Sequence, residues 1–134
     1  MKILSFRVEY PSIGSGRYKN QLVSINNLNK INHFQLSKIK NKFKQDVKEW
    51  LVPEGIGEPI RDGVLIRTSI IRHNKRKFDA INTAVVVKWL EDILVESRII
   101  EDDKDNEIHH INTQYHTGLV QTMIQFEVYT KEDN

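Results

Sequence analysis

The chain has 134 residues, a formal net charge of +2 and no cysteine. This length is typical of one domain, 1–134, with a substantial core. The missing cysteines exclude disulfides and thiolate metal sites, and no apolar run has the length of a membrane span. The first nine residues are too charged for a signal peptide, so we expect a cytoplasmic protein with no membrane partner.

The small net charge conceals two halves of opposite sign. Residues 1–78 hold 16 Lys and Arg against 6 Asp and Glu, a net +10, whereas residues 79–134 hold 4 against 12, a net −8. A basic region attracts polyanions, and an acidic cluster attracts divalent cations. Charge runs are more often the solvated faces of helices, so the asymmetry alone does not decide the function.

The first half begins with a strand signal and continues into a helix. Residues 2–9 predict a strand stopped by Pro11, and the loop 11–20 is basic, with Arg17 and Lys19. Residues 22–25 predict a short strand. A helix over 35–51 follows, because apolar residues recur at helical spacing before Pro53 and Gly55. The other faces of this helix carry Lys38, Lys40, Lys42, Lys44 and Lys48.

The second half predicts the rest of the sheet and another helix. Residues 63–72 are partly continuous in apolar character, as is typical of a central strand. A basic run over 73–77 leads to Asp79, a candidate N-cap of a helix over 80–97. Residues 107–116 and 119–129 predict a β-hairpin. Together these patterns indicate an α+β fold: a single domain with a mixed sheet and two main helices.

Carboxylates gather around this second helix. Lys88 and Asp92 are four residues apart, so they share one helix face, and Asp102 and Asp103 stand side by side beyond the helix. Neighbouring carboxylates repel unless they are solvated or hold a cation. Taken singly, each acid also fits a cap, an exposed ion pair or a polar turn. Acids from two segments, with basic residues beside them, favour a metal-dependent enzyme that acts on phosphodiesters.

The order of these segments resembles a known family. Tyr10-Pro11-Ser12-Ile13 follows the first strand, a basic helix comes next, and a basic run leads into Asp79 and Asn82. Lys88-x-x-x-Asp92 is followed after ten residues by Asp103. This arrangement resembles the RusA family of Holliday-junction resolvases, which are often carried by phages. The last block resembles the family's Lys-x-x-x-Asp and Asp-Asp pair most closely.

The resemblance implies a magnesium-dependent crossover junction endodeoxyribonuclease, a hydrolase of DNA recombination and repair. Its direct metal ligands would be Asp79 and Asp103 with Asp102 adjacent, for Mg²⁺ or alternatively Mn²⁺. Lys88 would neutralise the phosphate or orient the water, and the supporting residues would be Asp92 and Asn82. The family also implies a homodimer in a bacterial or phage-infected cell, acting on four-way junctions or other branched DNA. Its candidate DNA-binding residues here are Arg17, Lys19, Lys75, Arg76 and Lys77.

The upstream block departs from the family pattern. The family has Asp-x-Asp-Asn, but Ile81 stands at the second aspartate if Asp79 and Asn82 keep the register. Counting back from Lys88 without an insertion would instead place Asn82 and Ala84 at the two aspartates. Either alignment removes one metal-binding carboxylate. Two alternatives therefore stay open: a catalytically impaired DNA-binding relative, and an oligomeric protein whose charged halves pair with each other.

Overall fold

Four strands form one mixed sheet. The computed structural model describes residues 1–51, 58–76, 78 and 80–131. The strands are β1 (Lys2–Glu9), β2 (Val64–Arg72), β3 (Glu107–Tyr115) and β4 (Met123–Thr130), in the order β1-β4-β2-β3. β4 is antiparallel to β1 and β2, whereas β3 is parallel to β2. The predicted α+β class with a mixed sheet is confirmed.

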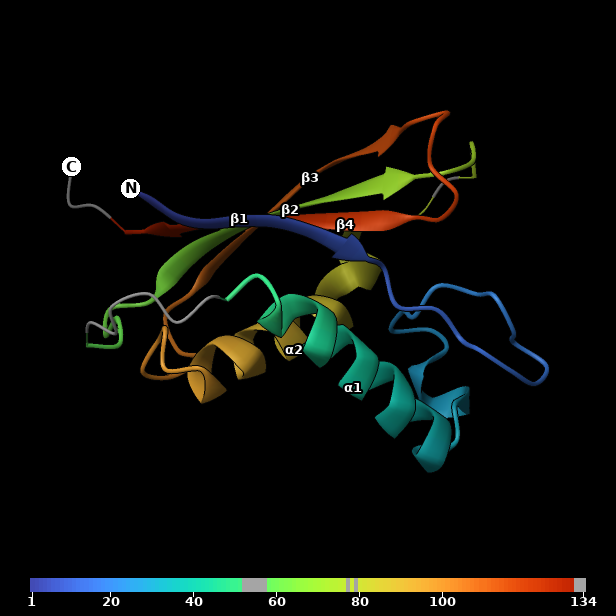
Figure 1. Cartoon of the computed structure of the whole chain (residues 1–134), viewed down its shortest axis with the longest axis horizontal. Coiled ribbons are helices and arrows are strands. Elements are labelled where there is room, and N and C mark those ends of the chain that lie inside the picture. Colours follow the sequence, from blue (N-terminus) through green and yellow to red (C-terminus); the bar gives the residue numbers. More distant parts are fainter. Residues whose placement is uncertain (52–57, 77, 79, 132–134) are drawn as a thin grey trace.

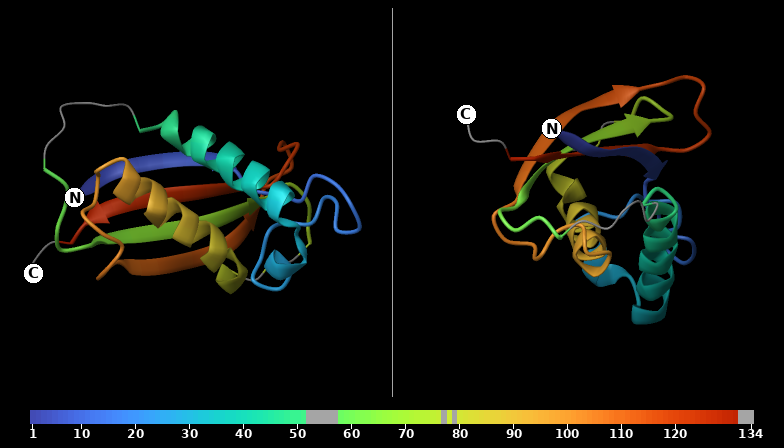
Figure 2. Two further views of the ribbon diagram at one scale, coloured as in Figure 1. Left: turned by 90° about the horizontal axis from the view of Figure 1, so that it is seen from below. Right: turned by 60° about the vertical axis from the view of Figure 1, so that its left-hand side comes forward.

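Both α-helices pack on the same face of the sheet (Figure 1). They are α1 (His33–Lys48) and α2 (Ala84–Glu96), and two short 3-10 helices, η1 (Leu28–Lys30) and η2 (Ala80–Thr83), precede them. The other face of the sheet carries neither α-helix (Figure 2). α2 joins the parallel strands β2 and β3, since such strands need a long crossover connection.

The predicted C-terminal hairpin is wrong. β3 and β4 do not pair, because β2 lies between them and hydrogen-bonds to both. The inner face of β2 carries the buried apolar residues Val64, Ile66 and Ile70, so a place with a neighbour on each side removes more apolar surface from water. The connection over 116–122 is long enough to cross from one side of β2 to the other.

The two main helices form with shifted ends. α1 begins at His33, two residues before the prediction, because the side chain of Asn32 accepts a hydrogen bond from Gln35 N at 2.9 Å. It ends at Lys48; the predicted stop residues Pro53 and Gly55 lie outside the described residues. The predicted helix over 80–97 divides into η2 and α2. The predicted N-cap, Asp79, also lies outside the described residues.

The core lies between the helices and the inner face of the sheet. Phe43 of α1 packs between two aromatic rings, with centroids 6.3 Å from Phe126 of β4 and 6.1 Å from Trp89 of α2. The helical spacing of apolar residues that predicted α1 starts at Phe34, but this side chain is 80% exposed and does not join the core. The predicted short strand near residue 23 is also wrong: Leu22 makes only an isolated bridge to Ser12. Among the described residues, neither α-helix has both the length and the apolar character that a membrane span needs.

Candidate functional site

Lys88 lies between two carboxylates on the surface of α2. Its Nζ donates a hydrogen bond to Asp103 Oδ2 and lies 3.4 Å from Asp92 Oδ1. Asp92 comes from the next turn of the same helix, whereas Asp103 comes from the loop between α2 and β3. The structure therefore brings together three of the residues that the sequence selected. All three side chains are open to water over at least 39% of their surface, so a ligand could reach them.

The loop 101–106, which carries Asp103, is held in place by contacts of Asn106 and Asp105 with other parts of the fold. The side chain of Asn106 accepts a hydrogen bond from Val64 N at 2.9 Å and donates one to Glu91 Oε2 at 2.7 Å. Lys131 Nζ donates to the carbonyl oxygen of Asp105. Asn106 thus ties the loop to β2 and to α2, which fixes the loop beside Lys88. The sequence did not identify Asn106 or Glu91, because their roles depend on contacts across the fold.

Asp102 lies in the same loop but has a local partner. Its Oδ1 accepts a hydrogen bond from Lys104 N at 2.8 Å, which is a turn contact within the loop. The other carboxylate oxygen of Asp102, Oδ2, takes no part in this hydrogen bond. Asp102 is exposed beside Asp103, as expected of adjacent residues in a loop.

The upstream part of the predicted site lies around η2. Asp79 lies outside the described residues, Asn82 is half-buried, and the Ile81 side chain is 68% exposed. An isoleucine this exposed contributes little to the core, so its position is a surface position. η2 is held to β3 by Thr83, whose hydroxyl lies 3.2 Å from His110 Nδ1.

Carboxylates of this loop have the oxygen donors that Mg²⁺ prefers. Asp102 and Asp103 supply two adjacent carboxylates, and Asp103 already binds the cationic Lys88. In the described part of the chain, no three Asp, Glu or His side chains gather closely enough to bind a metal ion. The donor chemistry therefore fits magnesium, while only two of the three predicted ligands, Asp102 and Asp103, belong to the described residues.

The predicted DNA-binding residues lie at another place in the fold. β1 and β2 run in the same direction, since both are antiparallel to β4, so the loops that follow them lie at one end of the sheet (Figure 2). Arg17 and Lys19 are exposed in the first loop, and Lys75 and Arg76 in the second. Lys77 lies outside the described residues.

Arg76 and Asp103 do not adjoin each other. Arg76 follows the C-terminal end of β2, whereas Asp103 precedes the N-terminal end of the neighbouring parallel strand β3. The nine residues of β3 span roughly 30 Å. The basic end and the acidic loop are therefore two separate regions along β3.

The lysines of α1 are largely engaged by acids of this chain. Lys42 Nζ lies 2.9 Å from both Glu9 and Asp46, and Glu96 pairs with Lys44 at 2.6 Å and with Lys48 at 3.4 Å. Lys40 lies over the ring of Trp89. These contacts reduce the positive field of α1, so its lysines leave less positive charge unpaired than their number suggests.

His110 is a polar residue near η2 that the sequence did not select. Its Nδ1 lies 3.0 Å from the hydroxyl of Thr68 and 3.2 Å from that of Thr83. Partial burial lowers the pKa of His110 below its ordinary value. The neutral ring is thus favoured in the folded state. The contribution of neutral His110 to stability is complete above the pKa that this histidine has in the unfolded chain. It is lost as the pH falls through the lower pKa of His110 in the folded protein.

We expect a His110→Gln variant to lose less stability on acidification than the natural chain. Glutamine keeps hydrogen-bonding capacity toward the two threonines but has no proton to gain. Thermal unfolding at about pH 7.5 and about pH 5 would compare the fall in Tm, on either side of the ordinary histidine pKa. His116→Gln, at an exposed histidine just beyond β3, is the matched control. Its Tm should fall by as much as that of the natural chain. Equal falls for all three proteins would contradict the prediction.

No family model and no curated protein sequence matches this chain. The resemblance to the RusA family is therefore a hypothesis that rests on the sequence motifs alone.

Proposed function

We propose that this chain is a magnesium-dependent, structure-specific DNA endonuclease of the RusA type that resolves four-way junctions in recombination and repair. The observation that carries the proposal is the contact of Lys88 with both Asp92 and Asp103. These residues stand at the family's spacing, and the fold places them on one accessible surface. An ion pair with a single partner would be an ordinary surface contact. A lysine shared by two acids from separate elements, beside a third acid, suits chemistry on a phosphate.

Each residue has a definite role in this proposal. Asp103 and Asp102 would hold Mg²⁺, which would supply charge neutralisation and a more acidic bound water, while the third predicted ligand, Asp79, lies outside the described residues. Lys88 draws a phosphodiester oxygen toward the acidic loop and stabilises the negative charge that develops on it. Asp92 keeps the Lys88 side chain directed along α2 toward Asp103.

The proposed substrate is branched DNA, bound by a homodimer. Two equivalent copies related by a twofold axis would nick opposite strands of a four-way junction symmetrically. Contacts to phosphates position such a protein without reading the base sequence. The exposed residues Arg17, Lys19, Lys75 and Arg76 are proposed to make them, together with Lys77.

An Asp103→Asn variant tests the proposal. We expect at least a roughly 100-fold loss of junction cleavage in Mg²⁺, about 2.7 kcal/mol of activation free energy. Binding should persist or improve, because one negative charge near the phosphates is removed. The loss of activity is measured as the rate of cleavage of a labelled synthetic four-way junction. The affinity for DNA is measured as binding of the same junction without metal.

Glu101→Gln is the matched control for Asp103→Asn. It removes the same charge from the same loop, at an exposed acid whose partner Arg61 is 3.8 Å away. It should cut as the natural chain does. Junction binding by the natural chain without paired nicks in Mg²⁺ or Mn²⁺ would overturn the proposed activity.

The exposed Ile81 favours a second candidate, a DNA-binding relative that does not cut. This position lacks the second carboxylate of the family's Asp-x-Asp-Asn motif, and its side chain points to solvent rather than into the core. Such a protein would bind junctions with a steep dependence on salt and show no cleavage that Mg²⁺ stimulates.

A further inference from the structure

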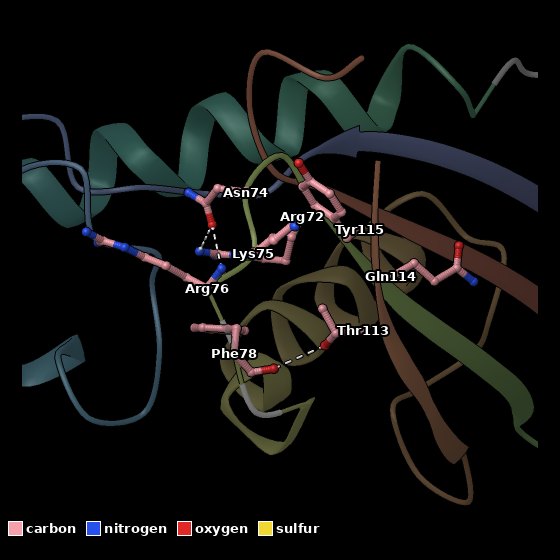
Figure 3. A pocket seen from close by; sticks show the side chains of 8 residues that line it. All are labelled: Arg72, Asn74, Lys75, Arg76, Phe78, Thr113, Gln114 and Tyr115. Atoms are coloured by element: carbon pink, nitrogen blue, oxygen red, sulfur yellow. Dashed lines mark hydrogen bonds between the residues drawn. The ribbon is translucent and has the colours of Figure 1, made fainter. Parts of the chain in front are cut away.

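A pocket of about 280 Å³ opens where β2 and β3 end, away from the acidic loop. Figure 3 shows its lining: residues of β2 and of the turn that follows it on one side, and of β3 on the other. Three of the lining side chains are the cations Arg72, Lys75 and Arg76. No acidic side chain lines the pocket among the described residues. The pocket is thus strongly positive.

Arg72 is the unusual member of this group. It is the last residue of β2 and follows Val64, Ile66, Thr68 and Ile70 on the face that is covered by the helices. The residue is only 7% exposed, and its Nε has no hydrogen-bond partner among the described residues. Burial of an arginine is costly unless an acceptor satisfies the guanidinium.

Among the described residues, the contacts of Arg72 supply no counter-charge. Its Nη2 donates to Asn74 Oδ1 at 2.9 Å, a neutral acceptor, and the guanidinium lies over the ring of Phe78. Burial and then the positive charge of Arg76 lower the pKa of Arg72. Arginine nevertheless stays protonated in proteins, so the charge remains, and an anion in the pocket would balance it.

The surrounding turn holds the other two cations near the pocket. Asn74 Oδ1 also accepts a hydrogen bond from Arg76 N at 3.0 Å, so one amide side chain organises both arginines (Figure 3). Lys75 Nζ lies 5.9 Å from the centre of the Tyr115 ring. A buried N–H donor without a partner, with two further cations among the lining residues, suits the several acceptor oxygens of a phosphoryl group.

We propose that this pocket binds a phosphoryl anion, with Arg72 Nε as the buried donor and with Lys75 and Arg76 at its rim. The proposal is independent of cleavage at the acidic loop, since it needs neither a metal nor the residues around Lys88. The phosphoryl group has two sources, a free phosphate or the backbone of a nucleic acid. Both present the same oxygens to the guanidinium.

Titration of the natural chain with inorganic phosphate tests the proposal directly. In NMR spectra that resolve the arginine Nε–H groups, the Arg72 signal should shift and saturate, and the Arg67 signal should not. Arg67 lies on the same strand but is exposed and does not line the pocket. Potassium chloride at the same ionic strength is the control for general screening. An Arg72 signal that phosphate leaves unmoved would overturn the proposal.

Thermal unfolding of matched variants gives a second measurement. With a Kd of about 10 mM, phosphate at about 50 mM should raise the Tm of the natural chain by about 3 °C. Arg72→Met should lose this rise, while its Tm without phosphate should equal or exceed that of the natural chain, because a buried unpaired donor is removed. Arg67→Met should keep the rise. A rise of the same size in Arg72→Met would contradict the proposal.

Binding of a labelled four-way junction and of single-stranded DNA, without metal, distinguishes the two sources. If the pocket receives a backbone phosphate, Arg72→Met should weaken binding of at least one of these DNAs about tenfold, and phosphate should compete with the DNA. If it receives a free phosphate, the DNA affinity should be the same for Arg72→Met and the natural chain. The NMR titration and the Tm rise are expected in both cases.

Discussion

An Ile81→Asp variant should cut a four-way junction at least about tenfold faster than the natural chain in magnesium, a gain of about 1.4 kcal/mol. The change restores a carboxylate where the family pattern has its second aspartate. Because the Ile81 side chain is 68% exposed, an aspartate there is solvated and should disturb the fold little. The rate of nicking at saturating Mg²⁺, measured with excess protein, is the test.

Three variants make this gain interpretable. Ile81→Asn has nearly the shape of aspartate without its charge and should not gain activity. Ile81→Asp combined with Asp103→Asn should be inactive if both acids serve one metal site. Ala84→Asp places the carboxylate at the position that the alignment without an insertion selects, and we expect no gain from it. A gain in Ala84→Asp but not in Ile81→Asp would show that the preferred register is wrong.

A Gly63→Ala variant should lower the stability of the protein by about 2–4 kcal/mol, or its Tm by about 10 °C. Gly63 has φ +79°, a backbone conformation that costs about 1 kcal/mol for residues with a Cβ. In addition, a Cβ at this position would lie 2.3 Å from the carbonyl oxygen of Asp105, so the loop 101–106 would have to move away from β2. Thermal and urea unfolding measure the loss.

Two other glycines separate the causes of this loss. Gly16 also has a positive φ, +84°, but a Cβ there would meet nothing within 4 Å, so Gly16→Ala should cost only about 1 kcal/mol. Gly14 has an equally open surrounding without a positive φ, so Gly14→Ala should be nearly neutral. Losses of similar size in Gly16→Ala and Gly63→Ala would show that the contact with Asp105 contributes nothing.

The Gly63 prediction also bears on the acidic loop. The contact between Gly63 and Asp105 lies two residues from Asp103, and Asn106 ties the same segment to Val64. Displacement of this segment should therefore loosen the contact of Asp103 with Lys88. In the proposed enzyme, Gly63→Ala should reduce cleavage even under conditions where the protein remains folded.

Local patterns in the sequence predicted most of the elements. The partly continuous apolar run of β2 predicted a central strand, and the helical spacing of Phe43 and Val47 predicted α1, because the apolar pattern shows which residues must leave water. The ends of the helices were less accurate. The start of α1 depends on the side chain of Asn32, and the predicted helix over 80–97 begins instead with the 3-10 turn η2.

The sequence also determined the pairing of Lys88 with Asp92, because four residues are about one turn of any α-helix. Only the tertiary structure decided that Asp103 joins them, since that contact needs the loop to be fixed by Val64 and Glu91. It likewise decided that β2 separates β3 from β4, because strand order follows from which neighbours bury the most apolar surface. The central place of β2 also explains why Arg72 is buried. Arg72 is the last residue of this strand that faces the helices, so its side chain lies inside although it is charged.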